Sequence, residues 1–232
     1  YGIGFRVSSI VILLISGVNR SLAPLIYNHY KEIGTPKQLS NIFRYFIAVA
    51  LLFFVGLSLF AIEMLMLLTT PAYYESSKII IYLVPAILLS QMYIFAPGTG
   101  IAKKTKIIMF INIGAAIITI ILNWLLIPYF GYKGAAVATL ITYFTVFIIY
   151  INESQKYYYI PFQWRNIIFA VALSTPLAIS SFYIEFGFMT NIIIKILLLF
   201  FLPIIFLISG LITKKEISQA YILVSNLFPK KN

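Results

Sequence analysis

Long apolar runs, each about as long as a membrane-crossing helix, follow one another along almost the whole chain. A bilayer core requires about 20 mostly apolar residues per helix. Seven segments reach this length, at 5–30, 43–68, 79–97, 107–127, 134–151, 167–184 and 192–212. The pattern predicts an all-α, polytopic transmembrane helix bundle of about seven spans over residues 1–212.

The last segment, 213–232, has a different pattern. Its apolar residues recur at a spacing that places them on one face of a helix, at Ile217, Tyr221, Val224 and Phe228, with lysines at both ends. Such a segment lies along a membrane surface rather than across it. We therefore expect a short amphipathic tail on the cytoplasmic leaflet.

The composition agrees with a membrane protein. Hydrophobic residues make up 62% of the chain and charged residues only 10%, whereas soluble domains have about 45–50% and about 25%. The mean hydropathy is +0.99. The sequence predicts an integral protein of the cell membrane.

Basic residues alternate between the loops. One set of loops and loop ends holds twelve of them: Lys31, Lys37, Arg44, Lys103, Lys104, Lys106, Lys156, Arg165, Lys214, Lys215, Lys230 and Lys231. The other set holds four: Arg6, Lys78, Lys133 and Lys195. By the positive-inside rule the first set is cytoplasmic, so residue 1 lies outside and the C-terminus inside. The net charge of +11 is explained by topology, and no nucleic-acid partner is expected.

Groups for catalysis are sparse. The chain has no cysteine, a single histidine, and six acidic residues, all of them glutamates that are well separated in sequence. Paired carboxylates and clustered metal ligands are therefore missing from the pattern. We expect no catalytic residue, no metal site and no cofactor, and hence no enzyme.

Arg20 is the main candidate for function, because it lies inside the first apolar run. An arginine within the membrane faces the bundle interior or a wet cavity. The polar residues Ser9, Ser16 and Tyr27 share its helical stripe and Asn19 precedes it, so a cavity lining is one reading. The other reading is that the guanidinium extends to the headgroups at the membrane surface.

Further polar residues lie in later spans. Asn112, Thr119 and Asn123 fall on one face of the fourth span with Ala116, either as a cavity wall that binds sugar hydroxyls or, the favoured reading, as interhelical hydrogen-bonding groups. Glu63 lies near the outer end of the second span. It is a candidate for ion coupling, although an interfacial carboxylate is the favoured reading.

The junction between the fourth and fifth spans is very short. Pro128 predicts that the fourth helix ends at Ile127, since proline has no N–H and restricts the preceding residue. Gly131 provides the positive φ for a reversal. Gly134, Ala135 and Ala138 then give the next helix a flat surface that a neighbour can approach closely.

This junction reads Asn-x-x-x-Ile-Pro-x-x-Gly-x-x-Gly-Ala-Ala from Asn123 to Ala136. It resembles the polysaccharide-export branch of the multidrug/oligosaccharidyl-lipid/polysaccharide flippase superfamily. Tyr1-Gly2-x-x-Phe5-Arg6 with Pro24, and Thr70-Pro71-Ala72-Tyr73-Tyr74-x-Ser76, look like other parts of that family in the same order. The resemblance implies the C-terminal lobe of a two-lobe transporter without its first helix, with the N-terminal lobe as its missing partner.

The resemblance implies transport. The expected substrate is a polyprenyl-pyrophosphate-linked oligosaccharide, which crosses the cytoplasmic membrane by alternating access for polysaccharide biosynthesis such as O-antigen or capsule export. Arg20 would then pair with the pyrophosphate. A cation-coupled multidrug exporter of the same superfamily is the alternative. A membrane-embedded glycosyltransferase or polymerase fits less well, because the outer loops are short and aspartate is absent.

Overall fold

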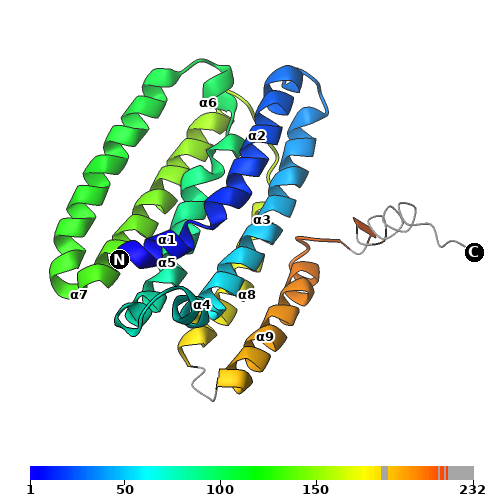
Figure 1. Cartoon of the computed structure of the whole chain (residues 1–232). Helices are drawn as coiled ribbons and strands as arrows, with labels where there is room; N and C mark the ends of the chain where they lie inside the picture. The colour runs from blue at the N-terminus through cyan, green and yellow to red at the C-terminus, as the bar shows by residue number, and fades with distance from the viewer. Residues whose placement is uncertain (184–187, 214, 217, 219–232) are drawn as a thin grey trace, which may run out of the picture.

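The computed structural model describes residues 1–183, 188–213, 215–216 and 218, and every regular element in this part of the chain is helical (Figure 1). The elements are α1 Gly2–Ser8, α2 Val11–His29, α3 Thr35–Leu59, α4 Ala61–Leu68, η1 Pro71–Ser76, α5 Ser77–Gln91, η2 Met92–Phe95, α6 Gly98–Ile101, α7 Thr105–Gln155, α8 Trp164–Ile179, η3 Ser180–Phe182 and α9 Phe188–Ile208. Most of the predicted amphipathic tail, including Ile217, Tyr221, Val224 and Phe228, lies outside the described residues.

Six stretches of helix in the described residues are long and apolar enough to cross a membrane. They are Gly2–His29, Thr35–Leu59, Pro71–Phe95, Thr105–Gln155, Trp164–Phe182 and Met189–Ile208. These helices indicate a membrane protein. The predicted spans overlap these stretches, with the fourth and fifth both on α7. The second predicted span, 43–68, is misplaced: the long helix is Thr35–Leu59, and the prediction crosses the break at Phe60 into the short helix α4. That all seven cross a bilayer stays a prediction.

Helix α7 is a hairpin of two arms and not one straight rod. Its 51 residues would extend about 77 Å at 1.5 Å per residue, more than twice a bilayer core of about 30 Å. Gly131 breaks it, with φ 55° and ψ −135°, a backbone conformation that essentially only glycine adopts. The predicted reversal at Gly131 is therefore confirmed.

The predicted end at Ile127 is wrong, because the helix continues through Pro128 to the reversal. Proline at this position removes the hydrogen bond to the carbonyl of Trp124, four residues earlier. Only a few residues follow before the chain turns, and local adjustments satisfy such a carbonyl in many membrane helices. The proline thus weakens the last turn of the first arm without ending it.

The two arms approach closely just after the reversal, as the small residues predict. A Cβ on Gly134 would lie only 2.4 Å from the carbonyl oxygen of Leu126 on the first arm. Farther along the second arm, Ala136 is fully buried against Ile79 and Leu83 of α5. Small side chains therefore allow contact on both sides of the second arm.

We expect Gly134→Ala to destabilise the protein by about 1–3 kcal/mol, the usual cost of overpacking, because its methyl group would overlap the backbone at Leu126. Gly114→Ala is the matched control on the same helix. No atom lies within 4 Å of a Cβ built there, so this change should stabilise the helix by up to about 1 kcal/mol. Unfolding in mixed detergent micelles measures both, and equal effects of the two changes would contradict the close approach.

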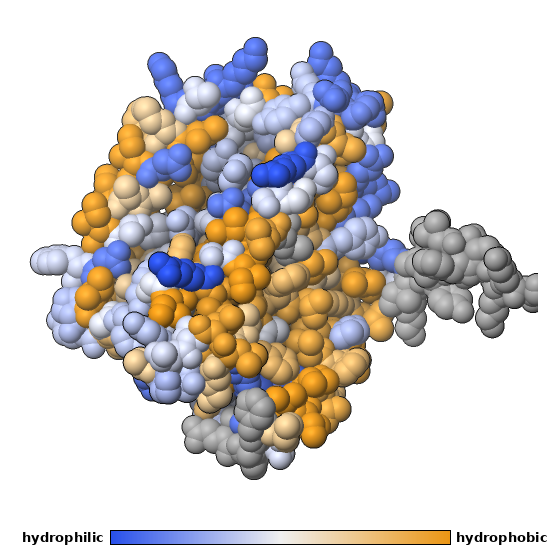
Figure 2. Space-filling model, in the orientation of Figure 1, coloured by the Kyte–Doolittle hydropathy of each residue, from blue (hydrophilic) through white to orange (hydrophobic). Residues whose placement is uncertain are grey.

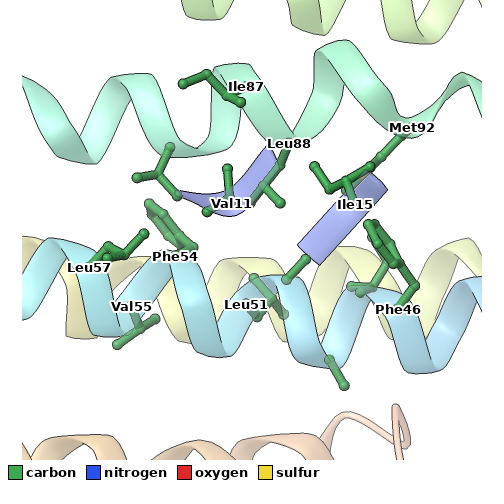
Figure 3. Packing of buried hydrophobic residues seen from close by; sticks show 14 of the residues in the cluster. Val11, Ile15, Phe46, Leu51, Phe54, Val55, Leu57, Ile87, Leu88 and Met92 are labelled. Carbon is green, nitrogen blue, oxygen red and sulfur yellow. The ribbon is translucent and has the colours of Figure 1, made fainter. Parts of the chain in front are cut away.

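The core lies where α2, α3 and α5 meet. Figure 3 shows Val11 and Ile15 of α2 between Ile87, Leu88 and Met92 on one side and side chains of α3 on the other. By contrast, no residue from 105 to 133 is buried, and in Figure 1 this first arm of α7 runs at the edge of the bundle beside its own second arm. The helix bundle therefore has a packed centre and one peripheral hairpin arm.

Candidate functional site

Arg20 lies on the outward face of α2. This helix buries Val11, Ile15, Leu22 and Ile26, and Arg20 is exposed on the other side. The guanidinium makes no ion pair or hydrogen bond within the described residues. It is nine residues, or about 14 Å of helix, from the end at His29. The structure therefore places an unpaired cation well inside a helix of membrane length.

The other polar residues predicted near Arg20 differ in what their side chains contact. The hydroxyl of Ser16 donates to the carbonyl of Leu13 at 2.9 Å, and that of Ser9 donates to Arg6 at 2.6 Å. Both serines thus bond to their own helix. Asn19 lies on the inner side of α2, half-buried, and its Oδ1 is buried without a partner among the described residues.

The polar face predicted for the fourth span splits in the structure. Thr119 Oγ1 donates to the carbonyl of Ala115 at 2.8 Å and lies 3.2 Å from Thr142 Oγ1 on the second arm. Asn112 is exposed, whereas Asn123 is half-buried with an Oδ1 that has no partner in the described part of the chain. Of these three residues, only Thr119 makes an interhelical contact of the kind that the sequence analysis favoured.

Glu63 forms a buried ion pair with Lys195. The Lys195 Nζ lies 2.5 Å from Glu63 Oε1, and the side chains are 1% and 10% exposed. The expectation that Lys195 belongs to an outer loop is wrong, since it lies inside α9. Neither reading of Glu63 anticipates this partner. The sequence feature that could have indicated the pair is a single basic residue, Lys195, inside an apolar run. However, 132 positions separate the two residues, and sequence periodicity carries no information over that distance.

A second ion pair lies beyond the other end of α9, between Arg44 of α3 and Glu216, which follows α9 in the chain. Arg44, buried in α3, binds the carboxylate of Glu216, and its Nη1 lies 3.5 Å from the carbonyl oxygen of Gly210. Glu216 also accepts hydrogen bonds from Tyr45 and from the backbone N–H and the hydroxyl of Thr213. Together with the Glu63–Lys195 pair, this contact fixes α9 antiparallel to α3 and α4 at both ends.

The surroundings of Glu216 lower its pKa. Burial alone raises the pKa of this carboxyl, but the hydrogen bonds from Tyr45 and Thr213 and the charge of Arg44 outweigh it and bring the pKa to about 2. A carboxyl whose pKa is lower in the folded state stabilises that state above its ordinary pKa of 4.5. This stability is lost as the pH falls from about 4.5 towards 2.

We therefore expect acid to destabilise the protein partly through Glu216. The free energy of unfolding, measured in mixed micelles at pH 6 and at pH 3, should fall further in the unmodified protein than in Glu216→Gln, which has no carboxyl to protonate. Equal losses in both proteins would show that this carboxylate does not hold the end of α9.

The side of the molecule that carries α1 and α2 is seen in Figure 2. Hydrophobic residues are exposed over much of this face. Hydrophilic residues gather along its upper rim, where Figure 1 places the α2–α3 and α6–α7 connections, and a few stand alone in the middle of the face. Within the described residues, no group of three or more His, Cys, Asp or Glu side chains could hold a metal ion. Arg20 is thus the main charged feature on the exposed face of α2.

Comparisons with protein-family models, with characterised proteins and with solved structures find no match for this chain. The flippase resemblance therefore rests on the motifs quoted above.

Proposed function

We propose that this chain is one lobe of a membrane transporter that flips a polyprenyl-pyrophosphate-linked oligosaccharide by alternating access. A pyrophosphate with several sugars cannot enter hydrocarbon without a polar path, because unpaired charges and polar groups in the bilayer core are costly. The lobe would supply one wall of that path, and α2 would be its lining helix.

The observation that carries the proposal is Arg20. An exposed guanidinium inside a helix of membrane length, with no partner in the described part of its own lobe, requires an anion from elsewhere or contact with water. The planar fork of arginine matches phosphate oxygens in a bidentate manner. A diphosphate that moves past this face is a suitable partner.

The exporter alternative is less well supported. Coupling to a cation requires a carboxylate within the membrane that is free to bind it. Glu63 lies in the apolar helix α4, and Lys195 already neutralises it at 2.5 Å. A lobe whose exposed intramembrane charge is positive is better suited to an anionic substrate.

Reconstitution tests the proposal. The full-length protein is placed in liposomes that carry a fluorescent oligosaccharide on a polyprenyl pyrophosphate, and the fraction accessible to an added glycosidase is followed. We expect the inner-leaflet substrate to become accessible, while a fluorescent phospholipid stays on its leaflet. Equal movement of both lipids, or of neither, would overturn the proposal.

A further inference from the structure

A large apolar groove lies between four helices, away from Arg20. It has a volume of about 880 Å³ and is lined by residues of α3, α5, the second arm of α7, and α8. The lining runs from Trp164 at the start of α8 to Phe182 in η3, about 27 Å at 1.5 Å per residue. It therefore spans almost the full thickness of a bilayer core, which is about 30 Å.

The chemistry of the lining determines what can fill this groove. Its side chains are almost all aliphatic or aromatic, with Thr175 and Tyr82 among the few that carry a hydroxyl. Water requires two to four polar partners at a site, and an empty groove forfeits dispersion contacts along its walls. Ile168 and Ala172 line the groove and are exposed, so it opens to the surface. The surrounding bilayer can fill it with a hydrocarbon chain.

One end of the groove carries positive charge. Trp164 lines that end, and the next residue, Arg165, is exposed and has no ion-pair partner among the described residues. The preceding connection brings Lys104 to the same end, with its Nζ 6.0 Å from the ring centre of Tyr157. Two acids near this end are already paired, Glu153 with Lys156 at 2.5 Å and Glu216 with Arg44. The charge at this end therefore complements an anionic headgroup.

We infer that the groove binds one acyl chain of an anionic phospholipid from the bilayer, with its phosphate at Arg165. Tryptophan beside a basic residue is typical of the interface where headgroups lie. A phospholipid with no net charge would fill the same groove, but the cation of its headgroup offsets its phosphate, so it would gain less from Arg165. The site is separate from the exposed face of α2, so the inference stands or falls independently of the flippase proposal.

The two tryptophans of the chain make a direct test possible. Trp164 lines the groove, whereas Trp124 is 77% exposed on the first arm of α7. Trp124→Phe leaves only the groove residue fluorescent, and Trp164→Phe leaves only the exposed one. Each variant of the full-length protein is reconstituted with phosphatidylglycerol or phosphatidylcholine, brominated on the acyl chain near the glycerol, and the quenching is measured at equal mole fractions.

We expect Trp164 to show an about fivefold preference for phosphatidylglycerol, the size that one basic residue contributes near an anionic surface. Trp124 should be quenched equally by the two lipids. Equal quenching of Trp164 by both lipids would overturn the site.

Variants made in the Trp124→Phe background test the binding of the acyl chain and of the headgroup separately. Ala172→Phe should fill the groove and reduce the quenching of Trp164, whereas Ala116→Phe, at an exposed alanine outside the groove, should not.

Arg165→Gln should remove the preference for phosphatidylglycerol, whereas Lys31→Gln, an exposed base on the α2–α3 turn, should leave it. Undiminished quenching in Ala172→Phe, or an unchanged preference in Arg165→Gln, would overturn the assignment.

Discussion

Replacing Arg20 by Gln should lower the rate of oligosaccharide flipping at least about tenfold. A hydrogen bond to a charged group contributes about 1.5–3 kcal/mol, and each 1.4 kcal/mol is a factor of ten. Arg20 is exposed and makes no ion pair in the described residues, so its removal leaves no partner unsatisfied among them. The loss should therefore appear in transport and not in folding. The measurement is the initial flipping rate in liposomes at equal amounts of reconstituted protein.

Two further variants make this result specific. Arg20→Lys keeps the charge but loses the bidentate fork, so it should transport at an intermediate rate. Arg6→Gln removes an exposed arginine near the far end of the same span and should leave the rate within about twofold of the unmodified protein. If Arg20→Gln flips the oligosaccharide at the unmodified rate, the guanidinium does not serve the substrate and extends to the headgroups instead.

The helices could be predicted from the sequence, because a run of about 20 apolar residues has few other stable forms. The short link at 128–134 also predicted a reversal at Gly131, since the required φ restricts the residue type. The exact end of the preceding helix could not be predicted, because the cost of Pro128 depends on how the freed carbonyl is satisfied. That is a property of the local environment and not of the residue order.

The site was harder to predict than the fold. Helical spacing left two interpretations of Arg20, a cavity lining or a guanidinium that extends to the headgroups, and the exposed position of Arg20 is compatible with both. The spacing also placed Asn112 and Thr119 on one face, which the structure divides between an exposed side and an interhelical contact. The pairing of Glu63 with Lys195 could not be predicted, because each residue alone fits a membrane-interface position. Only the packing of α9 against α3, which brings the start of α9 to α4, makes one charge the partner of the other.

Removing either charge of the Glu63–Lys195 pair should cause the largest loss of stability of any variant considered. Glu63→Met leaves a buried ammonium, and Lys195→Met leaves a buried carboxylate, so each should cost about 3–5 kcal/mol. The double variant removes both charges and should be near neutral or more stable by about 1–4 kcal/mol. Unfolding in mixed micelles measures all three, and Glu153→Gln, which breaks an exposed pair on α7, should cost only about 0.3–0.5 kcal/mol.

This cycle also separates the two transport readings. If Glu63 serves to hold α9 in place, Glu63→Met and Lys195→Met lose stability alike, and the double variant recovers both stability and flipping. If Glu63 instead binds a coupling cation, the double variant recovers stability but not transport, and the flipping rate of the unmodified protein depends on an ion gradient. Recovery of transport in the double variant would therefore assign the pair to the docking of α9, and would leave Arg20 as the membrane charge that serves the substrate.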